Sequence, residues 1–200
     1  MTAPDFSPRD LALWQAARPW LDVRSNDEHT LISYAMAKAL LELTRADESV
    51  VLPAILLHDT GWKKMPRAKL ALAVGPNARF PELQRDHELA SVDIGREILA
   101  RLDLGLEDAA ILAIIDGHDT TKTARSGNDA VMKDADKLWR FTPHGVRTIG
   151  GWFETPPAET LAMLRDFVLP SFLTPEARAM AGALWAEAMA MLTLDERMGR

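Results

Sequence analysis

The stretch Val51-Leu-Pro-Ala-Ile-Leu-Leu-His-Asp-Thr-Gly61 contains the feature that decides the fold. A run of apolar side chains ends in an imidazole beside a carboxylate, and a glycine that we expect to end a helix follows at once. Burying His58 and Asp59 side by side costs free energy unless a partner group compensates for the lost hydration. A divalent cation is the most direct partner for such a pair.

Helical signals dominate the rest of the chain, and strand signals are almost absent. Ser7 and Pro8 are typical of a helix start, and Ser25 or Asn26 caps the next helix, whose first turn holds His29. Apolar spacing and the positions of Gly and Pro predict further helices at about 47–58, 82–102, 106–116, 128–141, 158–169 and 175–194. The segment from Thr60 to Pro81 is predicted to be mostly loop, and glycines and prolines are expected to break the segment after Pro143. The chain is therefore predicted to be all-α.

Composition excludes several classes of function. With 200 residues, of which 48% are hydrophobic, the chain is long enough for one domain with a sizeable core. The net charge of −6 argues against a nucleic acid polymer or an anionic membrane as partner. The absence of cysteine leaves nitrogen and oxygen as the available metal ligands. No secretory signal and no apolar run of roughly 20 residues is present, so we expect a cytoplasmic protein without a membrane span.

The metal-capable residues fall on different predicted helices or at their ends. A helix bundle can bring such residues together at one interior point. The candidates, in chain order, are His29, His58, Asp59, His87, His118 and Asp136. The fifth histidine, His144, is interpreted as a surface or turn residue. Asp134 lies two residues before Asp136, so a helix would direct it away from the same point. Asp116 and Asp119 flank His118, either as acceptors that hold its ring or as turn caps.

Three short motifs carry a resemblance to a known family. They are Leu56-Leu-His-Asp-Thr-Gly61, the segment from His87 to Leu99 and Lys133-Asp-Ala-Asp-Lys-Leu138. With His29, the His-Asp pair and Asp136, the chain also has the order His, His-Asp, Asp. This pattern resembles the HD-domain superfamily of metal-dependent phosphohydrolases. The resemblance covers about 26–141 and implies an HD helical bundle. We expect a single domain over 1–200 with additional C-terminal helices at about 143–200.

The resemblance implies a ligand set. In that family the residues that match His29, His58, Asp59 and Asp136 bind one divalent ion, with His58 and Asp59 at the catalytic centre. Members with two further histidines bind a second ion, for which His87 and His118 are the candidates. A carboxylate has two oxygens to share, so Asp59 is the expected bridge. Imidazole with carboxylate is compatible with one or two ions of iron, manganese, cobalt, nickel, zinc or magnesium.

Cationic residues near these motifs are candidates for phosphate contacts. Lys63 and Lys64 follow the His-Asp pair, and Arg140 follows Asp136. Many relatives have lysine where this chain has Trp62. That indole either stacks on a base, covers the site or belongs to the core.

Three functions remain open from the sequence. The leading hypothesis is a phosphohydrolase that uses a metal-activated water on a small phosphorylated molecule, such as a nucleotide or a phosphomonoester. The six-ligand set also resembles the mixed-valent di-iron oxygenases of the same superfamily. The third is a nucleotide-binding protein without turnover. An apolar stripe of the last helix, which includes Met180, Trp185 and Met191, either packs on the bundle or forms a homodimer interface.

Overall fold

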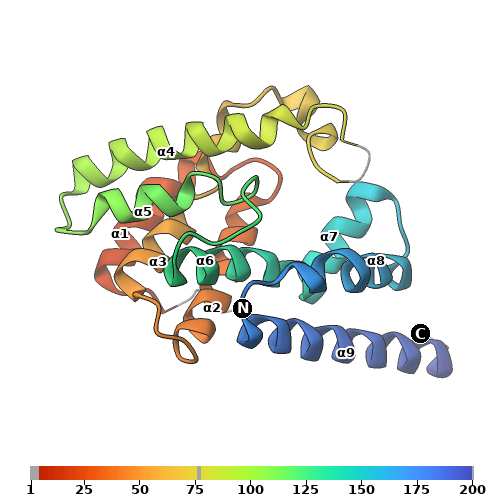
Figure 1. Ribbon diagram of the computed structural model, residues 1–200. Coiled ribbons are helices and arrows are strands. Elements are labelled where there is room, and N and C mark those ends of the chain that lie inside the picture. The colour runs from red at the N-terminus through yellow and green to blue at the C-terminus, as the bar shows by residue number, and fades with distance from the viewer. Residues whose placement is uncertain (1–4, 76–77, 200) are drawn as a thin grey trace.

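The computed structural model describes residues 5–75 and 78–199, and these residues form nine α-helices and no strand (Figure 1). The all-α prediction is confirmed. None of these helices is long and apolar enough to cross a membrane. The helices are α1 (Pro8–Ala17), α2 (Asn26–Leu41), α3 (Glu48–Leu57), α4 (Glu82–Leu102), α5 (Asp108–Ile115), α6 (Gly127–Leu138), α7 (Pro143–Phe153), α8 (Pro157–Met163) and α9 (Pro175–Met198).

Helix α3 is the centre of the bundle. Every residue from Val50 to Leu57 is buried, and α3 packs against α1, α2, α5 and α6. A helix that is apolar all round is stable only when other elements cover every side of it. Asp47 caps its first turn by accepting a hydrogen bond from the Ser49 backbone N–H at 2.8 Å, and the helix continues through Pro53. The central helix therefore ends by placing His58 and Asp59 in the interior.

The segment after Pro143 differs from the prediction. It is a continuous helix, α7, and its glycines do not break it. The Thr142 hydroxyl caps it by accepting from the Gly145 N–H at 3.1 Å, and Val146 and Ile149 bury the same face. A Cβ at Gly145 would lie 2.1 Å from the Trp139 carbonyl oxygen. This glycine therefore permits close packing of α7, and the burial outweighs its low helix propensity.

Asp134 connects the C-terminal helices to the core. Its buried carboxylate accepts hydrogen bonds from the backbone N–H groups of Leu173 and Thr174 at 3.0 and 2.7 Å, and from the Thr174 hydroxyl at 2.8 Å. Thr174 is also the N-cap of α9. The side chain of Asp134 is thus directed toward the start of α9, as its position relative to Asp136 predicts.

Much of the apolar stripe of α9 packs on the bundle. Met180, Leu184, Trp185 and Leu192 are partly buried against the core, and the Trp185 indole N–H donates to the Leu161 carbonyl at 3.0 Å. Met191 is 52% exposed. The homodimer interpretation stays a prediction.

Replacing Asp134 tests how α9 is attached. Asp134→Ala leaves three donors in a partly buried position without their acceptor, so we expect the free energy of unfolding to fall by about 2 to 3 kcal/mol. Urea denaturation followed by circular dichroism measures it. The exposed Asp93→Ala, which removes only a surface ion pair with Arg96, should change stability by less than about 1 kcal/mol. Equal effects of the two substitutions would contradict this role of Asp134.

Candidate metal centre

The six metal-capable residues predicted from the sequence meet in one buried cluster. The Nε2 atoms of His29 and His58 lie 3.1 Å apart, and those of His87 and His118 lie 3.2 Å apart. Asp136 joins the first pair, with its Oδ1 3.1 Å from His29 Nε2 and 3.6 Å from His58 Nε2. All six residues are buried, although they come from α2, α4 and α6 and from the segments after α3 and α5.

Backbone carbonyls orient three of the four rings. The Nδ1 atoms of His58, His87 and His118 lie 2.8, 3.3 and 2.9 Å from the carbonyl oxygens of Ile55, Leu83 and Ile115. A carbonyl oxygen only accepts, so each Nδ1 carries the proton and directs Nε2 into the cluster. This is the arrangement that metal-binding histidines commonly adopt. Neither aspartate beside His118 holds its ring.

Asp59 is in contact with both pairs of histidines. Its Oδ2 lies 3.5 Å from His29 Nε2, and its Oδ1 lies 3.7 Å from His58 Nε2. The same Oδ1 is 3.6 Å from the Nε2 atoms of both His87 and His118. One carboxylate therefore faces four imidazoles, which is the geometry expected of a bridge between two cation positions.

The cluster divides into two groups that fit metal ions. His29, His58 and Asp59 form the first, which Asp136 completes, and Asp59, His87 and His118 form the second. Ligands about 2.1 Å from an ion lie about 3.0 to 3.4 Å from one another at octahedral or tetrahedral angles, which matches the closer contacts here. Asp119 adds a carboxylate oxygen 3.7 Å from His87 Nε2 and 4.0 Å from His118 Nε2. The sequence predicted Asp119 only as an acceptor that holds the His118 ring or as a turn cap.

Electrostatics favour a cation at this position. Burial opposes ionisation of Asp59 and Asp136, yet the neighbouring imidazoles hold the pKa of both carboxyls well below the usual range. Burial also opposes protonation of His118, but the neighbouring carboxylates of Asp59 and Asp119 raise its pKa to about 10. The pKa of His58 is raised as well, because Asp59 and Asp136 outweigh its burial. Ionised carboxylates beside basic imidazoles attract protons or metal ions, which compete for the same lone pairs.

Gly61 lets α4 approach the His-Asp segment. A Cβ at this position would lie 2.0 Å from the His87 carbonyl oxygen, and the Gly61 N–H donates to the Ser91 hydroxyl at 2.8 Å. The predicted role as a helix-ending residue is wrong, because the helix ends at Leu57 and Gly61 lies in the 3₁₀ segment Thr60–Lys64 without a positive φ. Its absent side chain instead allows the contact that places His87.

The loop after His118 is held by two buried charged side chains that the sequence analysis did not identify. Glu88 accepts from the backbone N–H groups of Asp119 and Thr120 at 2.9 and 2.8 Å. The Lys133 ammonium donates to the carbonyls of Thr121 and Thr123, each at 3.1 Å. Glu88 directly follows His87 in the chain, and this adjacency was the available signal. Together, these hydrogen bonds of Glu88 and Lys133 keep Asp119 beside the second ligand group.

A cavity of about 810 Å³ opens onto the cluster through His29, Asp59, His118 and Asp136. Of the three predicted phosphate contacts, Arg140 lines this cavity, with its guanidinium 3.8 Å from Asp136 and 4.0 Å from Asp119.

Lys63 and Lys64 do not line the cavity. Lys63 pairs with Asp22, and the Lys64 ammonium lies over the Trp20 ring. Their role as substrate contacts stays a prediction that their placement does not favour.

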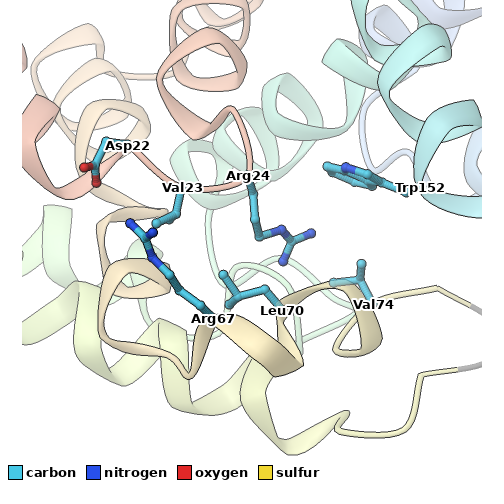
Figure 2. Close-up of a pocket in the computed structure, with 7 residues that line it drawn as sticks. All are labelled: Asp22, Val23, Arg24, Arg67, Leu70, Val74 and Trp152. Atoms are coloured by element: carbon cyan, nitrogen blue, oxygen red, sulfur yellow. The ribbon is translucent and has the colours of Figure 1, made fainter.

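Arg24 is a cation at this site that the sequence analysis missed. Its guanidinium carbon lies 4.3 Å from the Trp62 ring centroid and 5.0 Å from that of Trp152, and one terminal nitrogen is buried without a hydrogen-bond partner in the described chain. Burial lowers the pKa of Arg24, although Asp59 and Asp119 oppose this shift. Figure 2 shows its side chain directed into a second cavity of about 380 Å³, beside Trp152. Both cavities share Arg24, Val74 and Trp152.

Arg24 and the residue after it have an unusual backbone conformation. Arg24 and Ser25 have φ values of 56° and 58°, in the left-handed region that non-glycine residues rarely adopt. Ser25 occupies the N-cap position of α2, but its side chain makes no capping hydrogen bond. Such strain persists when the surrounding packing compensates for it, and here the two tryptophan rings hold the Arg24 side chain.

Trp62 contributes to the core and also covers the site. It is 3% exposed, and its ring stacks on His87 with centroids 4.0 Å apart. The Arg24 guanidinium also lies over the Trp62 ring. The indole is thus a packing element between a candidate ligand and a candidate anion-binding residue.

Comparison with family models matches residues 26–140 to the HD domain. The chain belongs to the HD domain family. The match includes all six candidate ligands and agrees with the predicted core at about 26–141. Searches of curated proteins and of solved structures gave no match. The HD match ends before α7, so the last three helices of this HD protein lie outside the matched region.

Gly61→Ala tests the close approach of α4. The added methyl group would meet backbone, which cannot move away as a side chain could, so we expect a loss of about 2 to 4 kcal/mol in stability. Thermal denaturation measures the change. Gly182→Ala is the matched control, because nothing lies within 4 Å of its Cβ position in α9, and it should be neutral or stabilise the protein by up to about 1 kcal/mol. A Gly61→Ala protein as stable as wild type would refute the steric argument.

Metal content tests the division into two ligand groups. Asp59→Ala removes the shared carboxylate, so it should weaken metal binding at both ligand groups. The double variant His87→Ala with His118→Ala should lower the number of metal ions bound per protein at saturation from two toward one. Elemental analysis of protein equilibrated with zinc or manganese gives the stoichiometry. His144→Gln is the control, because His144 pairs with Glu28 and Trp139 outside the cluster. Two ions retained by the double variant would exclude the second group.

Proposed function

We propose that this protein is a metal-dependent phosphohydrolase that acts on a small phosphorylated molecule, a nucleotide or a phosphomonoester. One observation carries the proposal. The Asp59 carboxylate faces four histidine Nε2 atoms at 3.5 to 3.7 Å, beside a cavity that also holds cationic side chains. Membership of the HD domain family supports the same class of reaction.

His29, His58, Asp59 and Asp136 would hold one divalent ion, and His87, His118 and Asp59 a second. Iron, manganese, cobalt, nickel, zinc and magnesium all remain candidates for this donor set. A divalent ion at such a site lowers the pKa of a coordinated water and neutralises charge on phosphoryl oxygens.

Arginines supply the second requirement of the reaction, which is recognition of the anion. Arg140 lies near the carboxylates of Asp136 and Asp119, and Arg24 lines the same cavity with a buried nitrogen that has no hydrogen-bond partner among the described residues. Guanidinium groups bind phosphate through paired hydrogen bonds. Lys122 and Lys137 also line the cavity and add positive charge in a protein whose net charge is −6. These groups would hold the phosphate toward the metal ligands.

The complete second ligand group favours one other candidate function. His87 and His118 join Asp59 in the arrangement that resembles the mixed-valent di-iron oxygenases of this superfamily. Such an enzyme requires dioxygen together with ferrous iron, whereas hydrolysis requires no dioxygen with any of these metals. The intact set of ligands argues against the third hypothesis, a nucleotide-binding protein without turnover.

Substrate panels with matched variants test the proposal. Protein purified without oxygen and loaded with each candidate metal should release inorganic phosphate from at least one nucleotide or phosphomonoester in the absence of dioxygen. His58→Ala should lower kcat/KM by more than about 100-fold, because it removes a ligand of the first group. Arg140→Ala should lower kcat/KM by about 10- to 100-fold through loss of a charged hydrogen bond, and the exposed Arg96→Ala should not.

The oxygen dependence decides between the candidates. Turnover that needs ferrous iron and dioxygen would replace hydrolysis by the oxygenase reaction. A metal-loaded protein that is inactive on the whole panel under both conditions would exclude the phosphohydrolase and favour binding without catalysis.

A further inference from the structure

The large cavity has two ends of opposite character. One end carries the metal ligands and the side chains of Arg24, Asp119, Lys122 and Arg140. The other is apolar and comes from α7, α8 and the segment that follows α8, with Ile149, Trp152, Phe153, Met163, Phe167 and Phe172 among its lining residues. A small phosphate such as a short-chain monoester would occupy only the first end.

The apolar end contains little that could recognise a polar group. Among the described lining residues from 143 to 173, the polar side-chain groups are the Ser171 hydroxyl, which donates to the Val168 carbonyl at 2.7 Å, and the Trp152 indole N–H. The Lys137 ammonium also lines the cavity and donates to the Ser171 carbonyl at 3.0 Å. The ring edges of a nucleobase carry several donors and acceptors, which lose hydration in a cavity end that offers few partners. An alkyl or aryl group has no such cost and gains from removing apolar surface from water. The lining therefore favours an apolar group over a base.

Exposed aromatic side chains mark this end as a surface for a ligand. Phe167 is 76% exposed, and Trp152 is 38% exposed. Phe167 lies in a π-helical turn, Leu164–Val168, a rare conformation that is frequent at functional sites. Single exposed apolar residues are ordinary, but here both line one cavity that also opens onto a metal-ligand cluster. An apolar group that binds here would cover Phe167 and Trp152, and removing their surface from water would contribute to its affinity.

Arg24 lies where the two ends meet. Its guanidinium is held against the Trp152 ring at 5.0 Å and also lies on the cavity with Asp59 and Asp119. Figure 2 shows the Arg24 guanidinium beside Trp152. We call the lining formed by Trp152, Phe153, Phe167 and Phe172 the aromatic wall. A ligand that binds Arg24 through its anionic group would place the rest of the molecule along this wall.

We propose that the substrate is a phosphate ester, or a related phosphorus anion, of an extended alkyl or aryl group, and that the helices after residue 142 select this group. The inference rests on the proposed function for the position of the phosphate, and it narrows the substrate class from phosphomonoesters and nucleotides to apolar monoesters.

Binding of alkylphosphonates tests the proposal without requiring turnover. Ethyl-, butyl-, hexyl- and octylphosphonate are titrated calorimetrically into the metal-loaded full-length protein without oxygen, with AMP as the nucleotide probe. Affinity should rise about fourfold for each methylene that the wall covers, and octylphosphonate should bind more tightly than AMP. Affinity that does not depend on chain length, or AMP as the tightest ligand, would overturn the proposal.

Variants of the wall connect this preference to the C-terminal helices. Phe167→Ser should reduce the affinity for octylphosphonate by about tenfold, because it removes an apolar contact with the alkyl chain of the ligand. The ratio of octyl- to ethylphosphonate affinity should therefore fall. Trp152→Ala should act in the same direction. Leu43→Ser is the control, because Leu43 is 58% exposed and does not line the cavity. An unchanged ratio in both wall variants would show that the wall does not select the ligand.

Hydrolysis of the matching esters separates this inference from the proposed function. If octyl phosphate is hydrolysed with a higher kcat/KM than ethyl phosphate and AMP, both stand. Hydrolysis without chain-length preference would leave the phosphohydrolase and remove the apolar substrate. Chain-length-dependent phosphonate binding without any hydrolysis would leave the apolar ligand and remove the phosphohydrolase.

Discussion

The structure depends on the sharing of one buried carboxylate among four imidazoles. Asp59 lies within 3.7 Å of four histidine Nε2 atoms, and all four histidines are buried. Burial of ionisable groups is unfavourable unless opposite charges or cations balance them. The helices that carry the histidines must therefore meet at Asp59. The wholly buried helix α3 holds this residue at the centre, and the other helices surround it.

The second ligand group requires a close backbone contact as well as electrostatics. Without a side chain at Gly61, α4 lies near enough for His87 to face Asp59. The buried side chains of Glu88 and Lys133 then hold the loop after α5, which carries Asp119 to the same place. The precision of the site thus comes from buried hydrogen bonds to backbone groups, which have few alternative arrangements once solvent is excluded.

Two parts of the chain, the HD-matched segment and the C-terminal helices, line different portions of the cavity. The segment matched by the HD domain contributes the candidate ligands and most of the cationic groups, and the C-terminal helices contribute the aromatic side chains Trp152, Phe153 and Phe167. Asp134 joins the two parts, because it accepts the N–H groups at the start of α9 while Asp136, two residues later, faces the histidines. One turn of α6 therefore contributes both to the histidine–aspartate cluster and to the attachment of the helices that complete the cavity.

The sequence by itself determined the helical class, the HD family and the six candidate ligands, because helix caps, apolar periodicity and the order of the motifs are local signals. It did not predict α7, since whether Gly145 breaks a helix or permits close packing depends on what lies beside it. Nor did it predict Arg24 as a cavity residue, because two tryptophan rings distant in the chain hold that side chain.

Lys63 is near the His-Asp pair in the chain, yet in the tertiary structure its ammonium pairs with Asp22 and does not line the cavity. The composition of the cavity was decided only by tertiary structure, because its lining comes from segments whose proximity follows from the packing of buried surfaces and from no local pattern.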